Sequence, residues 1–188
     1  MTRKRAIALS SILTTAALAA VGLLYGNANQ LKAPDLPAIT PGYYKVTEVV
    51  DGDTIQVDMN GTLEKVRFIG VDTPETKKPN AAVQCYGPEA SDFTKKALTG
   101  KSVRLEADPL DDNRDRYGRL LRYIYLQDGS LLEETLIRQG WGFAYTSFPF
   151  QKKTEFIELQ NEAQKNKAGL WGVCTPTNTG GRWTSNDL

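Results

Sequence analysis

Three short segments rich in β-branched and aromatic residues follow one another, and tight turns separate them. They are YYKVTEVV (43–50), DTIQVD (53–58) and LEKVRFIGV (63–71), with Asp51-Gly52 and Asn60-Gly61 between them. Asp-Gly and Asn-Gly between alternating apolar residues are strong hairpin signals, because glycine accepts positive φ without a steric penalty. The sequence therefore predicts three consecutive strands joined by tight turns.

Two more strands and three helices are expected further along the chain. SVRLEAD (102–108) and RLLRYIYL (119–126) have strand composition. Helical spacing of apolar residues, with glycine just past the end, marks the segments 86–100, 130–140 and 151–169. The first of these helices carries Pro88 at a first helical position, and the second opens on a capping box from Ser130 to Glu133.

The order of these elements points to one fold. Five short strands with a helix between the third and the fourth match an OB-type barrel with helices covering one end. We therefore expect an α+β fold, a five-stranded OB-fold β-barrel with about three α-helices. Oligonucleotide-binding proteins commonly use this architecture, but a fold alone does not give a function.

The first residues are typical of targeting sequence and not of the folded domain. MTRKR is a basic start, and an apolar run from Ala6 to Tyr25 follows it. Residues 1–28 are thus a signal peptide or an N-terminal membrane anchor, since the run is about as long as the roughly 20 residues that span a bilayer. Either alternative places the domain outside the cytosol, secreted or in the cell envelope.

The remaining boundaries follow from composition. Residues 29–42 form a proline-rich linker, and residues 43–174 contain all the expected strands and helices. The polar, glycine-rich segment 175–188 is expected to be a flexible tail. The two cysteines, Cys85 and Cys174, are an even count in an exported chain and favour one disulfide, with two unpaired buried thiols as the alternative.

Overall charge and the absence of one residue type narrow the chemistry. The net charge is +1, so bulk charge does not indicate phosphate binding and any basic site must be local. The chain has no histidine, which excludes imidazole bases and histidine-ligated zinc. Acid–base chemistry near neutral pH falls to carboxylates, tyrosine, lysine or thiol.

Three carboxylates stand near the ends of neighbouring predicted strands. They are Asp53 after the first turn, and Asp72 and Glu75 after the strand that carries Arg67. Taken singly, Asp72 is a turn residue and Glu75 a solvated acid. Together, and without histidine or thiol, they suit a hard cation such as Ca²⁺, which takes roughly 6–8 oxygen ligands.

A third segment, DDNRDRYGRLL, crowds Arg114, Arg116 and Arg119 beside Tyr117. Internal aspartate–arginine pairs in a solvated loop explain Arg114 best. The planar guanidinium of Arg119 can bind phosphate oxygens in pairs, and Arg119 with Arg67 could hold one phosphate.

The motifs VVDGDT, VRFIGVDTPET, YGPEASDFTKK, DRYGR and LIRQGWGFAY occur in this order from about Tyr43 to Trp171. In sequence and spacing they resemble the staphylococcal nuclease (thermonuclease) family. The resemblance implies an OB-barrel nuclease that requires Ca²⁺ and cleaves the 5′ side of phosphodiesters in DNA and RNA, releasing 3′-phosphate products. Single-stranded or locally melted nucleic acid is the expected substrate.

The resemblance also implies roles for individual residues. Arg67, Glu75 and Arg119 would be catalytic, with Glu75 as the general base or the group that orients the attacking water, and the two arginines on the scissile phosphate. Asp53, Asp72 and the Thr73 carbonyl would bind calcium, and Arg116, Tyr117 and Tyr145 would contact the nucleotide or a neighbouring phosphate. Two positions depart from the family: Arg116 stands where lysine is frequent, and Ser147 where a second tyrosine is often found.

Two other classes of function are considered. Domains of this lineage can lose catalysis and act as binding modules, but Glu75, Arg67 and Arg119 are all present. A cell-surface adhesion protein that used the basic loop would bind polymer without cleavage and without sensitivity to chelators. Apart from a membrane tether through the N-terminal segment, no protein partner is implied.

Overall fold

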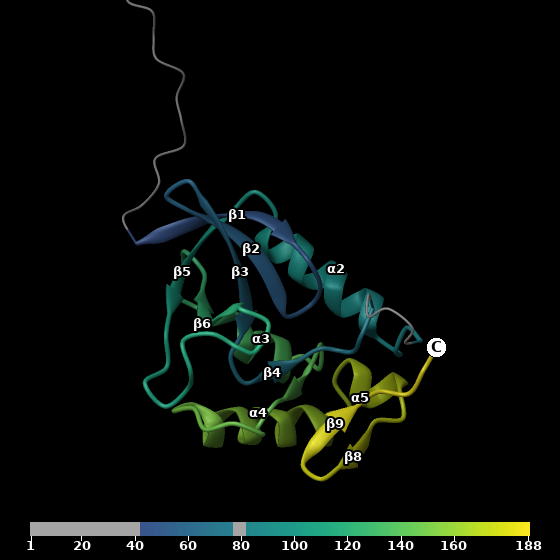
Figure 1. The fold of residues 1–188 in the computed structure, drawn as a ribbon. Helices are drawn as coiled ribbons and strands as arrows, with labels where there is room; N and C mark the ends of the chain where they lie inside the picture. Colours follow the sequence, from purple (N-terminus) through teal and green to yellow (C-terminus); the bar gives the residue numbers. More distant parts are fainter. Residues whose placement is uncertain (1–41, 77–81) are drawn as a thin grey trace, which may run out of the picture. The chain divides into compact units, whose positions relative to one another are not determined.

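The structure is a computed structural model that describes residues 42–76 and 82–188 (Figure 1). The chain divides into two units, residues 1–38 and 39–188, and all described residues belong to the second. The expected signal or anchor (1–28) and nearly all of the linker (29–42) lie outside the described residues. Among the described residues, none of the helices combines the length and the apolar character that crossing a bilayer requires.

Five strands form a closed barrel, as the sequence predicts. They are β1 (Tyr43–Val49), β2 (Thr54–Met59), β3 (Thr62–Phe68), β5 (Ser102–Glu106) and β6 (Leu120–Tyr125). Their order around the barrel is β1-β2-β3-β6-β5, and β1 pairs with β5 to close it. The β3–β6 pair is parallel and the others are antiparallel. This is the expected OB-fold, and the prediction is confirmed.

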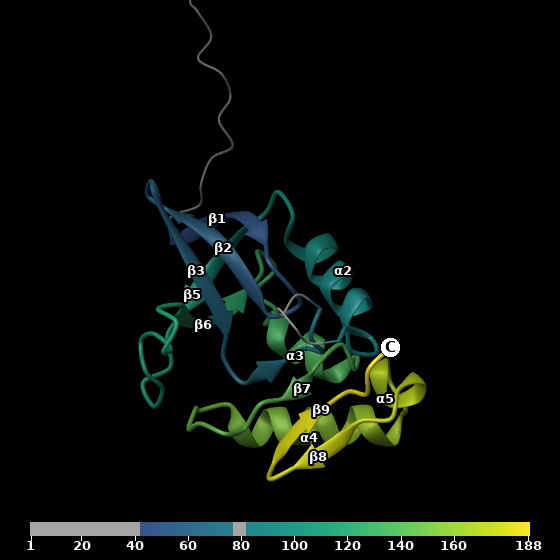
Figure 2. The same ribbon diagram turned by 45° about the vertical axis from the view of Figure 1, so that its right-hand side comes forward.

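The three expected helices are present, and a short fourth one follows. They are α2 (Gly87–Leu98), α3 (Leu132–Arg138), α4 (Lys153–Lys165) and α5 (Leu170–Val173). A two-residue ladder joins β4 (Val71–Asp72) to β7 (Phe143–Ala144), so the segment after β3 is tied to the chain between α3 and α4. Figure 2 shows β7 and α4 close to the C-terminal strands.

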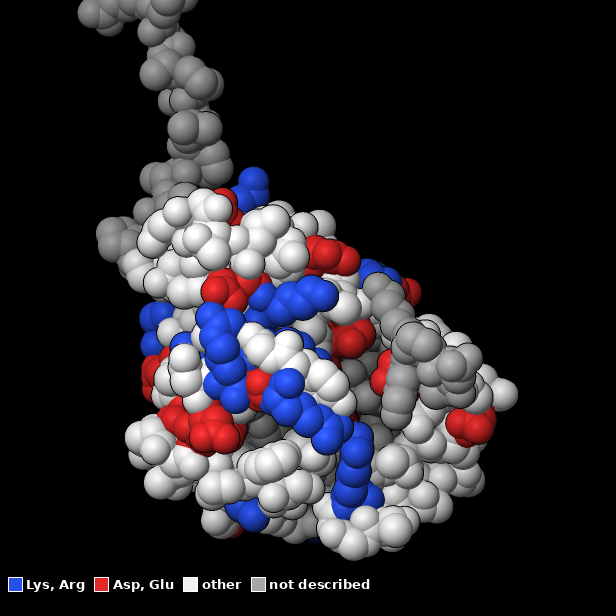
Figure 3. Space-filling model, viewed as in Figure 1, with Lys and Arg blue, Asp and Glu red and all other residues white. Residues whose placement is uncertain are grey.

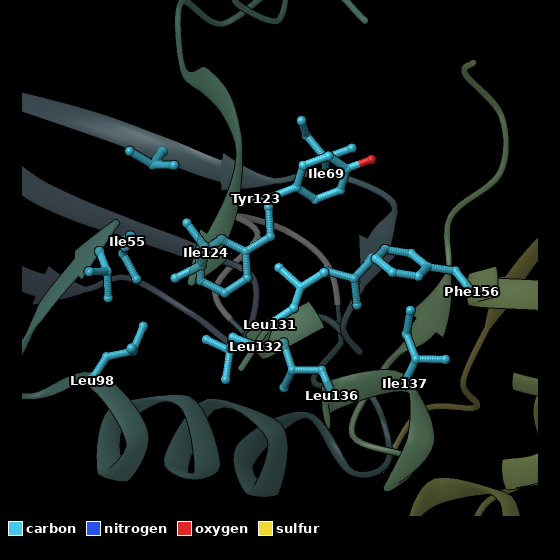
Figure 4. Packing of buried hydrophobic residues seen from close by; sticks show 14 of the residues in the cluster. Ile55, Ile69, Leu98, Tyr123, Ile124, Leu131, Leu132, Leu136, Ile137 and Phe156 are labelled. Atoms are coloured by element: carbon cyan, nitrogen blue, oxygen red, sulfur yellow. The ribbon is translucent and has the colours of Figure 1, made fainter. Parts of the chain in front are cut away.

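The hydrophobic core joins the barrel to the helices. Buried side chains from β2 and β6, such as Ile55 and Ile124, pack in one cluster with Leu98 of α2 and with Leu132 and Leu136 of α3 (Figure 4). All five are at most 1% exposed. Burying one such side chain stabilises the fold by about 1.5–3 kcal/mol, so this cluster fixes the helices against the barrel.

The turn between β1 and β2 is where the sequence predicts it, but glycine is needed there for another reason. The N–H groups of Val50 and Asp51 donate to the Thr54 carbonyl, and Asp51 Oδ1 accepts from the Asp53 N–H at 3.2 Å. Gly52 does not have a positive φ. A Cβ atom at this position would lie 2.6 Å from Thr73 Oγ1, so the absence of a side chain permits close packing.

The predicted capping box at the start of α3 is wrong. Leu131 is the N-cap, and no side chain caps the helix. Glu133 points inward and is fully buried, and its two carboxyl oxygens accept the N–H of Ile124 at 3.1 and 3.2 Å. The Ser130 hydroxyl donates to Asp128 instead. A tertiary contact with strand β6 therefore replaces the local one.

The expectation of a loose tail over residues 175–188 is also wrong. Strands β8 (Thr177–Thr179) and β9 (Arg182–Thr184) form an antiparallel hairpin. Trp183 stacks on Phe143 of β7, with ring centroids 6.5 Å apart and planes inclined by 15°, and meets Trp171 edge-on at 5.0 Å. Aromatic packing onto the domain holds a segment whose polar composition suggests disorder.

The predicted disulfide is confirmed. Cys85 and Cys174 are bonded, with a Cα–Cα distance of 6.0 Å. The bond joins the segment just before α2 to the residue just after α5. Next to it, Asn186 accepts the N–H of Cys85 through its carbonyl and the N–H of Thr175 through its side chain. The start of the C-terminal hairpin is thus fixed to the domain.

Candidate active site

The predicted site residues meet in one cleft of about 950 Å³ at the end of the barrel where β3 leads into β4. The residues assigned a catalytic, metal-binding or substrate-binding role from the sequence all line it: Asp53, Arg67, Asp72, Thr73, Glu75, Arg116, Tyr117, Arg119 and Tyr145. Figure 3 shows Lys and Arg side chains gathered on this face, with acidic side chains between them. The net charge does not reveal this gathering of arginines and acids in one cleft.

Arg67 lies at the centre of the cleft. Its side chain is only 13% exposed and projects between two carboxylates, with Nη1 2.6 Å from Asp53 and Nη2 2.8 Å from Asp72. Strand pairing explains the position, because Arg67 on β3 is opposite Thr54 on β2, the residue after Asp53. The costly charge inside a strand is therefore paired on both sides.

Thr73, which follows Asp72, forms hydrogen bonds with Asp53. Its backbone N–H and its hydroxyl both donate to Asp53 Oδ2, at 2.8 and 3.0 Å, while Thr54 donates to Asp53 Oδ1. Asp53 is consequently fixed by three protein donors besides Arg67, and it is only 6% exposed. These contacts involve both oxygens and fix the orientation of the Asp53 carboxylate.

In the cleft, several aspartates crowd around the buried guanidinium of Arg67, and burial and charge shift the pKa values of Asp51 and Asp72. Burial raises the pKa of Asp51 to about 7, and the negative charge of Asp53 adds to the effect. Burial also raises the pKa of Asp72, although Arg67 opposes it. Burial disfavours the charged form of Arg67, but Asp53 and Asp72 outweigh it and hold the pKa of Arg67 above its ordinary value. An added cation would relieve the repulsion among these aspartates.

The backbone fixes Glu75 at the mouth of the site. Its N–H donates to Gln84 Oε1 at 2.9 Å and its carbonyl accepts the N–H of Gln84. Its carboxylate accepts the Thr76 N–H at 3.0 Å. The segment after Pro74 is thereby held against the residue that precedes Cys85, so the disulfide region supports this carboxylate.

Arg119 comes from the residue before β6, and a neighbouring acid holds it. Its Nε and Nη2 each lie 2.7 Å from Asp115 Oδ2, and its Nη1 lies 3.4 Å from the Thr54 hydroxyl. The side chain is 26% exposed. Although burial works against it, the contacts with Arg119 lower the pKa of Asp115, so the ion pair is a stable support for this arginine.

The loop arginines separate as expected. Arg114 pairs with Glu64 of β3 through both Nη atoms, at 2.8 and 2.9 Å, which agrees with the ion-pair interpretation, although the partner is not one of the loop aspartates. Arg116 donates to the Tyr117 hydroxyl at 2.7 Å. Tyr117 is 68% exposed and Arg119 lies over its ring, 5.4 Å from the centroid.

Phe148 and Arg182 also line the cleft, although the sequence-based assignment gives them no role. Phe148 is 56% exposed and lies beside Tyr145, with centroids 5.9 Å apart, next to the position where Ser147 replaces the expected tyrosine. Arg182 of β9 reaches Asp72 Oδ2 at 3.0 Å. Phe148 could have been found from the sequence, because it is an aromatic residue directly after Ser147. Nothing in the polar tail indicates a role for Arg182.

Carboxylates alone would supply only part of the ligands that a hard cation needs in this cleft. Within residues 42–76 and 82–188, no group of three or more His, Cys, Asp or Glu side chains is arranged to hold a metal. Asp53 and Asp72 lie on different nitrogens of the Arg67 guanidinium, which contacts both carboxylates, and the donors that these two side chains offer are oxygens. A shell built on these two carboxylates would need carbonyls, water and ligand oxygens, which calcium accepts.

The fold and the cleft together define a class: an OB-fold protein whose open cleft combines arginines, aspartates and exposed aromatic side chains beside the third strand. The comparisons with known proteins agree with this architecture. Residues 65–173 match the family described as "Staphylococcal nuclease homologue". The chain belongs to the staphylococcal nuclease family.

Individual relatives are similar over most of the domain. The chain is 50% identical over 129 residues to the Thermonuclease of Staphylococcus hyicus, covering 68% of this chain and 75% of that protein. It is 48% identical, with the same coverage, to the Thermonuclease of Staphylococcus intermedius. It is 42% identical over 126 residues to Endonuclease YncB of Bacillus subtilis, covering 65% of this chain and 58% of that protein.

Proposed function

We propose that the protein is a calcium-dependent nuclease that hydrolyses phosphodiester bonds of DNA and RNA by 5′ P–O cleavage, giving 3′-phosphate products. Relatives named thermonuclease and endonuclease support hydrolysis of nucleic acid. The observation that carries the proposal is the cleft in which Arg67, Arg119 and Glu75 converge beside Asp53 and Asp72.

In this proposal the two arginines bind the scissile phosphate. Arg67 is held from behind by Asp53 and Asp72, and Arg119 by Asp115, so both guanidinium groups are positioned before substrate arrives. Arginine stays charged throughout the reaction because its pKa lies above about 12. Donors placed in advance stabilise the charge that grows on phosphate oxygens in the transition state, where one such donor contributes about 10²–10³-fold.

Glu75 acts as the general base. Its carboxylate takes a proton from a water molecule as that water attacks phosphorus. The bond from phosphorus to the 5′ oxygen breaks, and this oxygen takes a proton from solvent and leaves as a hydroxyl, while the phosphate stays on the 3′ side. A positioned base contributes about 10²–10⁴-fold. When bound by Asp53, Asp72 and the Thr73 carbonyl, Ca²⁺ supplies electrostatic stabilisation of the phosphate charge.

Aromatic side chains in the cleft support single-stranded or locally melted substrates. Tyr117, Tyr145 and Phe148 line the cleft, and bases of an unpaired strand stack on such rings. The disulfide fits a protein that is secreted or held in the cell envelope. A membrane tether through residues 1–28 is compatible with this location.

The decisive experiment uses the full chain and a fluorescent single-stranded DNA oligonucleotide. We expect cleavage with Ca²⁺, no cleavage with a chelator, and fragments whose 3′ ends accept a new nucleotide only after phosphatase treatment. A Glu75→Gln variant should bind without cleaving. Binding without cleavage by the wild type, whether or not a chelator is present, would identify a binding module or an adhesion protein instead.

A further inference from the structure

The C-terminal hairpin forms one edge of the cleft, although it lies beyond the residues 65–173 that match the family. Trp183 packs against Phe143, whose backbone pairs with Asp72 in the β4–β7 ladder. The Asn178 side chain accepts the Gly181 N–H at 3.0 Å and closes the hairpin turn. The hairpin is therefore built onto the same strand pair that carries Asp72 and leads into Tyr145.

Arg182 is the residue that the hairpin contributes. Its Nη2 lies 3.0 Å from Asp72 Oδ2, and its guanidinium carbon lies 5.5 Å from the centre of the Tyr145 ring. The side chain is 56% exposed and lines the cleft. Figure 3 shows basic side chains continuing across this face toward the hairpin region.

The two arginines on Asp72 differ in what they offer to a ligand. Arg67 takes Oδ1 and is 13% exposed, with its other side against Asp53. Arg182 takes Oδ2 with one Nη group and leaves the rest of its planar guanidinium on the open side, beside an aromatic ring. Guanidinium groups bind phosphate oxygens in pairs, and aromatic rings stack bases of single strands.

We propose that Arg182 is a substrate-binding residue that contacts a backbone phosphate next to the scissile one, while the adjoining nucleotide stacks on Tyr145. This inference rests on the proposed nuclease function and adds a subsite from the C-terminal hairpin. The other interpretation is that Arg182 serves only to neutralise Asp72.

The test compares Arg182→Gln and Arg182→Lys with Arg104→Gln. Arg104 is a matched control, because it also pairs with an acid (Glu106, 2.6 Å) and covers a tyrosine ring (Tyr125, 3.9 Å), but it does not line the cleft. Dissociation constants for a single-stranded oligonucleotide are measured across a salt series at saturating Ca²⁺, in a Glu75→Gln background that prevents cleavage. Turnover is measured with Glu75 intact, and thermal unfolding checks that each variant folds.

If Arg182 contacts phosphate, Arg182→Gln raises the dissociation constant at low salt on the order of tenfold. It also reduces the slope of log affinity against log salt by about 0.7, the value for one phosphate contact in a single strand. Arg182→Lys keeps most of the slope, whereas the control Arg104→Gln changes neither quantity and keeps kcat within about twofold of the wild type.

A slope for Arg182→Gln equal to that of the parent would overturn the inference, as would a fall in kcat with unchanged affinity, which would show that Arg182 acts only through Asp72. The proposed function is judged separately by cleavage in the wild type. If the wild type does not cleave, that function fails, and the salt slopes still decide whether Arg182 binds a phosphate.

Discussion

Asp53 Oδ2 accepts two hydrogen bonds from Thr73, one from the backbone N–H at 2.8 Å and one from the hydroxyl at 3.0 Å. These bonds join the turn after β1 to the segment after β4, two parts of the chain that the sequence separates by 20 residues. Gly52 closes the same contact, since a Cβ atom there would meet three side-chain atoms of Thr73 at 2.6–2.8 Å. The turn and the proposed ligands thus form one packed unit.

Replacing Gly52 with alanine should therefore damage the site more than the fold. The new methyl group forces Thr73 to shift and disturbs both hydrogen bonds to Asp53. We expect activity to fall at least tenfold, with a loss of about 1–3 kcal/mol in the free energy of unfolding, as is usual for overpacking. Steady-state kinetics and urea unfolding measure the two effects. Full activity in a stably folded variant would contradict the coupling.

Glu75→Gln and Arg119→Ala should each lower kcat by about 10²–10⁴-fold while the unfolding midpoint changes little. In the proposed mechanism the base and the phosphate donor act on the reacting group, and both side chains line the cleft and do not belong to the buried core. Glu89→Gln on the exposed face of α2 and Arg104→Gln on β5 are the matched controls. A rate near that of the wild type in either cleft variant would reject the proposed mechanism.

Calcium should bind weakly until substrate arrives. In the proposed site only Asp53 and Asp72 would supply direct carboxylates, so a phosphate oxygen would help to complete the shell, and metal and substrate would strengthen each other's binding reciprocally. Calorimetry with Ca²⁺ should give a tighter dissociation constant when a nucleotide bisphosphate is present. Mg²⁺ prefers a rigid octahedral shell and should support little cleavage. Equal Ca²⁺ affinity in both titrations, or full activity in Mg²⁺ alone, would count against this site.

Removing the disulfide should destabilise the domain and loosen the C-terminal hairpin. The Cys85→Ser/Cys174→Ser variant is expected to lose roughly 2–5 kcal/mol in the free energy of unfolding. Protease cleavage within residues 175–188 should become faster, because the bond fixes the start of the hairpin. Reduced wild type is the natural comparison and should behave in the same way. An unchanged cleavage rate would mean that aromatic packing alone holds the hairpin.

Glu133 should make stability depend on pH in an unusual direction. Burial raises the pKa of this carboxyl well above its ordinary value of 4.5, so the folded protein keeps it protonated after the unfolded chain has ionised it. The stability that Glu133 contributes is complete below pH 4.5 and is lost as pH rises toward its folded pKa, by at most about 1.4 kcal/mol for each pH unit in that window. Glu133→Gln should therefore gain stability relative to the wild type between pH 4 and pH 7.

Unfolding midpoints at the two pH values check this, with Glu158→Gln on the exposed face of α4 as the control. A Glu133→Gln difference that stays constant between pH 4 and pH 7 would show that the carboxyl titrates normally.

Local patterns were sufficient to predict most of the barrel. The Asp-Gly and Asn-Gly turns lie on either side of β2, which pairs with β1 and with β3. Alternating apolar residues mark the strands, because each strand buries one face. The position of Asp53 in the cleft follows from the same turn. The resemblance to the nuclease family named the cleft residues correctly as neighbours, although their roles remain predictions.

The errors occur where a distant contact overrides a local preference. Ser130 and Glu133 have the spacing of a capping box, yet Glu133 forms hydrogen bonds with β6, which is a tertiary partner that spacing cannot reveal. The tail is polar and rich in glycine, but its Trp183 packs against Phe143 and Trp171. Arg182 could not be assigned for the same reason, since its neighbours in the sequence do not include Asp72.

The closure of the barrel also determines the order in which the molecule can form. Strand β1 pairs with β5, and β3 pairs with β6, so the pairings that complete the barrel join segments far apart in sequence. Such long-range pairings should make folding slow. Cys174 follows all five of these strands. In a chain that emerges N-terminus first, all five barrel strands are therefore available to pair before Cys174 can form the disulfide.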